Sequence, residues 1–315
     1  MKRILSIVLV LVFALACLVA CDSTSTSTPD TSADTSDNTP AEKTYSLALA
    51  VDTAVSNKNK VSNTAMVLIL DADNKIVAAR IDTVEATPAL DNNGALVTQE
   101  SVSSKVELGD AYTGMAAGSW EKQVKAFETW LVGKSAADIA GTEFTKELIA
   151  GCTMTSSMAT FKALAAEAFA SELKVTFKTS DAISTGIALS TAVASGKGGK
   201  VTVTTDVASI AIVDGKVAAT AIDSIEQSFT IADGALVASE LAASKNEKGE
   251  AYTGMPAGAW YKQAAAFANS TVGKTVAELN DLETVSDALA AAGCTMKNTT
   301  EGYKTTIIKA ANNAK

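Results

Sequence analysis

The sequence contains no histidine among its 315 residues, and it has only 4 cysteines, 4 prolines and 5% aromatic residues. Without histidine the chain lacks the usual general base and the commonest ligands of zinc and haem. Serine hydrolase triads, zinc hydrolases and c-type cytochromes are therefore disfavoured. The net charge of −9 argues against a nucleic-acid binder and against an anionic membrane surface as partner.

The first 20 residues have the pattern of an export signal. Lys2 and Arg3 precede an apolar run over residues 4–20, and such a run after a charged start is typical of a secretory signal. The segment Leu-Val-Ala-Cys that ends at Cys21 resembles a bacterial lipobox, whose cysteine is acylated and becomes the mature N-terminus, whereas Cys17 is a poorer match. We expect lipidation of Cys21 and attachment to the outer face of the cell membrane.

The segment 21–43 is expected to be a tether. After Cys21 it is rich in Ser, Thr and Asp and contains Pro29 and Pro40 but no aromatic residue. Such a segment cannot bury enough apolar surface to offset the entropy lost on ordering, so we expect it to be disordered. A tether of this kind lifts the folded part off the membrane. A Gram-positive cell surface fits this organisation, and an outer-membrane or periplasmic location stays open.

The rest of the chain is a tandem duplication with an offset of about 140 residues. The segment 105–123 matches 245–263, and Ala-Gly-Cys-Thr-Met recurs at two places. Each copy has the length of an ordinary domain. We expect two domains of one fold, at 44–172 and 173–315.

Each repeat is expected to begin with strands and to end with helices. Apolar patterning predicts strands over 46–55, 63–71, 75–84, 200–205, 209–213 and 216–225. Asp214-Gly215 is typical of a hairpin turn. The helical spacing of Trp120, Val124, Phe127 and Leu131 predicts one buried helix face. The predicted fold class is α+β, with two copies of a small antiparallel sheet covered by helices.

The repeated Gly-Cys-Thr segment precedes a predicted helix start in each copy. Gly151 and Gly293 permit close approach of a ligand to the backbone, and the free N–H groups of the following helix suit a phosphate. The hydroxyls of Thr153 and Thr295 are therefore candidates to bind a phosphate-bearing ligand or to be esterified by it. The alternative is that these threonines cap the helix.

This segment resembles the flavin-attachment motif of FMN-binding domains, in which FMN is joined by a phosphoester bond to the last threonine of Ser/Thr-Gly-Ala-Thr. The resemblance implies that Thr153 and Thr295 carry FMN and that Gly151 and Gly293 are the motif glycines. The upstream aspartate of the motif has a counterpart only in the second repeat, as Asp287.

The segments 105–123 and 245–263 are similar to a block of membrane-anchored FMN-binding-like lipoproteins, some of whose relatives serve Gram-positive extracellular electron transfer. The resemblance implies FMN as cofactor, and a flavin transferase and a membrane quinol oxidoreductase as partners. Side chains expected to contact the flavin are Tyr112, Tyr252, Trp120, Trp260, Met115 and Met255. Ordinary core packing of these side chains is the alternative.

Cys152 and Cys294 stand where the flavin motif has alanine. They are interpreted as small buried residues, as thiols that face a redox ligand, or as one disulfide between the domains. The sequence contains no Cys/His cluster that would ligate a metal.

Three functions remain open at this point. The first is an electron carrier with two flavin domains tethered outside the membrane. The second is a non-redox surface lipoprotein that binds a ligand or a protein, and the third is a surface spacer. An enzyme is least expected, because no acid, base or nucleophile constellation is present.

Overall fold

The computed structural model describes residues 41–97, 99, 102–112, 118–196, 198–252, 255, 258–297 and 299–315. The expected signal segment with Cys17, the lipidation site Cys21, most of the tether and Met115 lie outside these residues. Within the described part, no helix combines the length and the apolar character that a membrane crossing requires.

The strands form two antiparallel four-stranded sheets with the orders β3-β2-β1-β4 and β5-β6-β7-β8. The first sheet consists of β1 (Lys43–Val55), β2 (Val61–Leu70), β3 (Ile76–Ala86) and β4 (Val175–Thr179). The second consists of β5 (Ile183–Ser195), β6 (Lys200–Val213), β7 (Lys216–Ala232) and β8 (Ala235–Ala238).

Helices follow β3 in the first repeat and β8 in the second. The first repeat contains α1 (Lys105–Leu108), η1 (Gly109–Ala111), α2 (Trp120–Leu131), α3 (Ala136–Ala140) and α4 (Thr155–Ala170). The second contains α5 (Lys245–Lys248), η2 (Gly249–Ala251), α6 (Trp260–Asn269), η3 (Glu278–Asp281), α7 (Asp287–Ala291) and α8 (Thr300–Asn312). The predicted α+β class is confirmed.

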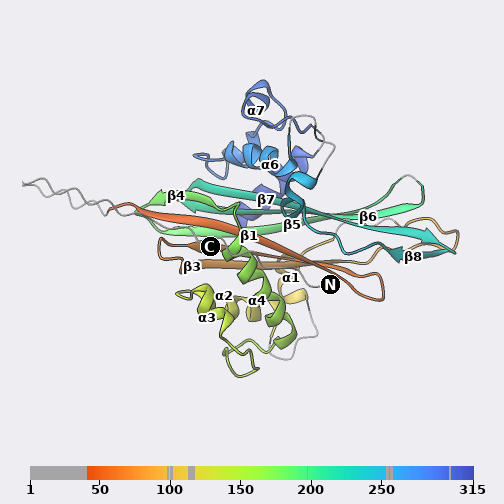
Figure 1. Cartoon of the computed structure of the whole chain (residues 1–315), viewed down its shortest axis with the longest axis horizontal. Coiled ribbons are helices and arrows are strands. Elements are labelled where there is room, and N and C mark those ends of the chain that lie inside the picture. The colour runs from red at the N-terminus through yellow and green to blue at the C-terminus, as the bar shows by residue number, and fades with distance from the viewer. Residues whose placement is uncertain are drawn as a thin grey trace, which may run out of the picture. The chain divides into compact units, whose positions relative to one another are not determined.

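The two sheets pack against each other, and helices cover their outer faces (Figure 1). Successive strand residues point to opposite faces, so Leu47 and Val51 of β1 join Leu189 and Val207 of the second sheet in a shared inner core. Ala48 and Ala50 point the other way, toward the helices of their own repeat. The arrangement buries both faces of each sheet, which is why the strands are apolar on both sides.

The predicted helix face on α2 is confirmed, since Trp120, Val124, Phe127 and Leu131 are all buried in the first outer core. The predicted turn between β6 and β7 is also confirmed. Asp214 and Gly215 both have positive φ angles, 47° and 71°, as a tight hairpin of this kind requires.

The predicted break between 205 and 209 is wrong, because β6 runs without interruption from Lys200 to Val213. Asp206 stays inside the strand because the Ser224 hydroxyl of β7 donates to its Oδ1 at 2.9 Å. A polar side chain with its own hydrogen-bond partner is tolerated in a central strand.

The strand β4 follows the predicted boundary at 172/173 but pairs with β1 of the first sheet over Lys43–Leu47. From Pro40 to Lys315 the chain forms one compact unit. The two repeats therefore share a strand pairing and an inner core as well as a sequence pattern.

Candidate functional site

Each repeat holds one lysine against two aromatic rings. In the first repeat the Lys105 ammonium lies 2.9 Å from Glu85 Oε1, and 4.6 and 5.6 Å from the ring centres of Tyr112 and Trp120. The Tyr112 hydroxyl donates to the other Glu85 oxygen at 3.4 Å. The capping box that Ser104 forms at the start of α1 fixes the helix that carries the lysine.

The second repeat repeats this cage with a more deeply buried lysine. Lys245 is 4% exposed, and its ammonium lies 2.7 Å from Glu226 Oε1 and 5.1 and 5.4 Å from the rings of Tyr252 and Trp260. Burial by itself lowers the pKa of Lys245, but Tyr303, Glu226 and Tyr252 together raise it further than burial lowers it. The ammonium therefore stays charged and holds the rings by cation–π contact.

A buried aspartate anchors the loop behind each cage. Asp82 Oδ1 accepts the backbone N–H groups of Thr83 and Val106 at 2.7 and 3.1 Å, and Asp223 does the same for Ser224 and Asn246. Burial raises the pKa of Asp82 to about 7, although hydrogen bonds from Ser104 and the backbone oppose the rise. Both aspartates thus fix where α1 and α5 begin.

The Gly-Cys-Thr segments are held by a glutamine of the Trp-x-x-Gln motif. The backbone N–H and the hydroxyl of Thr153 donate to Gln123 Oε1 at 2.9 and 3.1 Å. Thr295 donates in the same two ways to Gln263 Oε1, at 2.9 and 3.0 Å. Both glutamines are fully buried. The threonines therefore lie beside α4 and α8 without capping them, since the N-cap residues are Met154 and Thr299.

The glycines of these segments have positive φ angles and the cysteines are buried in both copies. Gly151 and Gly293 have φ angles of 83° and 99°, which glycine adopts more readily than other residues. Cys152 and Cys294 are both buried and both free, so the disulfide between them is absent. Burial raises the pKa of both thiols, which disfavours the reactive thiolate.

The structure thus separates the predicted flavin contacts into two groups. Tyr112, Tyr252, Trp120 and Trp260 belong to the lysine cages, and both indoles are only 2% exposed. Thr153 and Thr295 belong to the glutamine clamps instead. Met255 packs against the second outer core.

A cavity of about 750 Å³ lies beside Thr295 in the second repeat. Its walls include Asp287, Cys294 and Lys297 as well as the threonine. The volume is in the range that holds a cofactor. Of the residues predicted from the flavin motif, Thr295, Cys294 and Asp287 therefore meet at one hollow. No group of acidic or cysteine side chains within the described residues is arranged to hold a metal ion.

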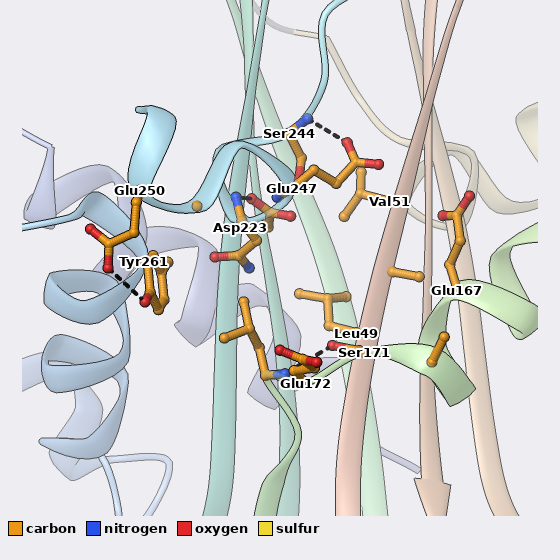
Figure 2. Close-up of a pocket in the computed structure, with 15 residues that line it drawn as sticks. Leu49, Val51, Glu167, Ser171, Glu172, Asp223, Ser244, Glu247, Glu250 and Tyr261 are labelled. Carbon is orange, nitrogen blue, oxygen red and sulfur yellow. Dashed lines mark hydrogen bonds between the residues drawn. The ribbon is translucent and has the colours of Figure 1, made fainter. Parts of the chain in front are cut away.

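A second cavity, of about 530 Å³, lies between the repeats (Figure 2). Its walls come from β1, from the end of α4 with the residues that follow it, and from α5, η2 and α6. Figure 2 shows the carboxylates of Glu167, Glu172, Glu247 and Glu250 arranged around it. A neighbouring hollow of about 580 Å³ shares Glu172, Leu173 and Tyr261 with it, so the two form one long groove.

This groove was not predicted from the sequence, because the repeats were compared at the positions where they agree. The groove is lined in part by positions at which they differ. The differences were present in the aligned repeats, for example Glu167 against Lys309 and Ala221 against Arg80. Compared with protein-family models, with curated proteins and with solved structures, the chain matches none.

Proposed function

We propose that the chain is a lipid-anchored surface protein that holds FMN beside Thr295 in its second repeat and carries electrons outside the membrane. The supporting observation is the cavity of about 750 Å³ whose wall Thr295 shares with Asp287, Cys294 and Lys297. Two of these residues, Thr295 and Asp287, are positions at which the sequence resembles the flavin-attachment motif, and Cys294 stands where that motif has alanine.

The residues of this cavity fit the phosphate end of FMN. Lys297 supplies a positive charge at the cavity wall, and α8 begins three residues later, at Thr300. The N–H groups of a helix start favour a phosphate. The Thr295 hydroxyl donates its hydrogen to Gln263, so the buried glutamine holds the oxygen that would carry the phosphoester. Bound FMN would supply the redox chemistry, and the chain would supply its position.

The expected stacking residues do not support the flavin ring in the same way. Trp260 packs edge-on against Tyr303, with ring centres 5.9 Å apart. The Lys245 ammonium lies 5.4 Å from the centre of the Trp260 ring. The support for flavin binding therefore comes from the Thr295 end of the site.

The test is the visible absorption spectrum and the intact mass of the full chain after co-expression with a flavin transferase. We expect flavin absorption and the mass of one FMN phosphoester. Thr295→Ala should abolish both, and the matched variant Thr153→Ala should retain them. A colourless, unmodified chain in every case would exclude the proposal.

The proposed anchor is tested separately. Cys21→Ser should release the protein from the membrane fraction and abolish the incorporation of labelled fatty acid, and Cys17→Ser should do neither. In the proposed setting, a membrane quinol oxidoreductase on the same membrane is the electron donor. Retention of the fatty-acid label by Cys21→Ser would show that another residue carries the lipid.

The second candidate function is a non-redox lipoprotein that binds a ligand or a protein at the surface. The observation that favours it is the long groove between the repeats, whose first part is lined by glutamates and which shares no residue with the cavity beside Thr295. The double variant Thr153→Ala/Thr295→Ala should leave such binding intact.

A further inference from the structure

The duplication builds the acidic groove a second time on the other side of the sandwich, and there it is closed. The second copy of the groove is bordered by Ile187 and Lys315, whose counterparts in the open groove are Leu49 and Leu173. The closed copy encloses only about 40 Å³, compared with about 530 Å³ in the open one. The same arrangement of strands and helices thus occurs twice in the molecule, once filled by side chains and once with an open cavity.

Basic side chains fill the closed groove. The Arg80 guanidinium donates to Glu128 Oε2 at 3.0 Å and to the backbone oxygens of Thr185 and Lys315 at 3.2 and 3.0 Å. The Lys309 ammonium lies 2.8 Å from Glu107 Oε1. The contacts of Arg80 with Thr185 and Lys315 cross from one repeat to the other, as does the Lys309–Glu107 pair, whereas Arg80 and Glu128 both belong to the first repeat.

The open groove lacks each of these cations. The positions of Arg80, Lys309 and Lys315 are taken by Ala221, Glu167 and Leu173. The closed groove has the Lys309 ammonium beside the carboxylate of Glu107. At the equivalent positions the open groove has two carboxylates, Glu167 and Glu247. Within the described residues no ion pair involves Glu167, Glu247 or Asp52.

Glu107, which binds Lys309, has an equivalent in the open groove, Glu247, whose side chain makes the same hydrogen bond to the backbone. Glu107 and Glu247 each close a capping box, with Oε2 accepting the backbone N–H of Ser104 or Ser244 at 2.8 or 2.7 Å. In Glu107 the other oxygen is the one that holds the ammonium. Oε1 of Glu247 is therefore equivalent to the Glu107 oxygen that binds the alkylammonium group of Lys309.

The charges around this oxygen repel one another. Burial raises the pKa of Glu167, and the nearby charges of Glu247 and Asp52 raise it further. Burial likewise raises the pKa of Asp52, and Glu247 adds to the effect. Three carboxylates of β1, α4 and α5 therefore face one region in which a positive charge would relieve their repulsion.

We propose that the open groove binds an aliphatic amine, whose ammonium group takes the place that Lys309 occupies in the closed groove. Leu49, Val51 and Leu173 give the groove an apolar wall for the carbon chain, much as the stem of a lysine lies along apolar surface. The volume far exceeds that of a bare ion, and the carboxylates are not arranged to hold a metal. The site does not depend on flavin, because Thr295 and its cavity share no residue with it.

The test is calorimetric titration of the detergent-solubilised full chain with cadaverine. We expect saturable binding that weakens as sodium chloride is added. A pentanediol of the same length, which lacks the charges, should not compete for the site, and magnesium chloride should weaken binding no more than sodium chloride of equal ionic strength does. Competition by the diol or a stronger effect of magnesium would overturn the proposal, as would the absence of saturable binding.

Two variants and one control distinguish binding in this groove from non-specific attraction of the amine to an acidic protein. Glu167→Lys copies Lys309 into the open groove, so it should abolish cadaverine binding while the chain remains folded. Glu247→Gln should weaken binding by about tenfold or more, since it removes one charged hydrogen bond. Glu107→Gln, the matched change in the closed groove, should leave binding unchanged. Wild-type affinity in Glu167→Lys, or equal effects of the two glutamine variants, would contradict the assignment.

Discussion

The Lys309 ammonium of α8 lies 2.8 Å from Glu107 Oε1 of α1, so a helix of the second repeat is fastened to a helix of the first. Together with the hydrogen bonds that Arg80 donates to the backbone oxygens of Thr185 and Lys315, this pair joins the two repeats on one side of the sandwich. The opposite side carries no such contacts between the equivalent residues of the described chain. The predictions below follow from this difference and from the buried polar groups that both copies share.

Arg80→Ala should lower the free energy of unfolding by about 3 kcal/mol, because it leaves a buried carboxylate without its partner. Glu128 has a side chain that is 8% exposed, and its other oxygen accepts the Ile81 backbone N–H at 2.7 Å. Burial raises the pKa of Glu128 to about 7 even with Arg80 present. Urea unfolding followed by circular dichroism at neutral pH measures the loss.

The matched control for this variant is Lys122→Ala. Its ion pair with Asp110 is formed by two exposed side chains at 2.9 Å, and exposed pairs contribute little to stability. Equal destabilisation by the two variants would contradict the role assigned to the buried pair.

The buried aspartates should make the protein more stable at mildly acid pH than at alkaline pH. Burial raises the pKa of Asp82 to about 7 and that of Asp223 to about 6, although hydrogen bonds oppose the rise. Their ordinary value is 3.8, so between these limits the folded state binds more protons than the unfolded state. The free energy of unfolding therefore falls as the pH rises through about 6 to 7.

Urea unfolding at about pH 5 and about pH 8 tests this sign. Asp82→Asn should flatten the fall, because the amide oxygen can still accept the N–H groups of Thr83 and Val106 but no longer titrates. A variant whose stability changes with pH as steeply as that of the wild type would show that Asp82 is not the source.

Gln263→Ala should destabilise the chain by roughly 2 kcal/mol, because it leaves the Thr295 backbone N–H without its acceptor. The glutamine also donates to the Gly258 backbone oxygen at 3.1 Å, so the variant loosens both segments that it joins. Thr295→Val removes only the hydroxyl contact and should cost less. Thermal unfolding of both variants gives the order, and a larger loss in Thr295→Val would argue against the clamp.

Cys152 and Cys294 should react slowly with an aromatic disulfide reagent in the native protein and fully after unfolding in guanidinium. Both thiols are buried, and burial raises the pKa of each, so little thiolate is available. The intact mass of the unreduced protein should correspond to two free thiols at these positions. Rapid native labelling would indicate that the segments open or that a thiol faces a ligand.

The sequence was sufficient to predict the α+β class, the helix face of α2 and the hairpin at Asp214, because each depends on neighbouring residues. The repeated Gly-Cys-Thr and Trp-x-x-Gln motifs could likewise be found by comparing the two repeats of the sequence. Two features depended on distant partners and were not predicted. The strand β4 pairs with β1, about 130 residues away in the chain, and Asp206 remains in a strand because Ser224 of β7 satisfies it.

The candidate site was predicted only in part. Thr295, Cys294 and Asp287, which the comparison with the flavin motif singled out, line one cavity, and their binding of FMN stays a prediction. The aromatic residues were predicted as ligand contacts or as core side chains, and Trp120 and Trp260 lie buried against Lys105 and Lys245. A buried lysine is uncommon, and each of these is paired with a carboxylate, Glu85 from β3 or Glu226 from β7.

The pairing of β4 with only the first part of β1 leaves the rest of that strand, from Ala48 to Val55, bonded to β2 alone within the described chain. A bare strand edge invites a strand of another molecule, and proteins commonly protect such edges with charge. Asp52 lies on this length of strand, and Glu167 and Glu247 stand beside it. The carboxylates that would attract an amine thus also repel neighbouring copies, so neutralising them should make the protein prone to aggregate.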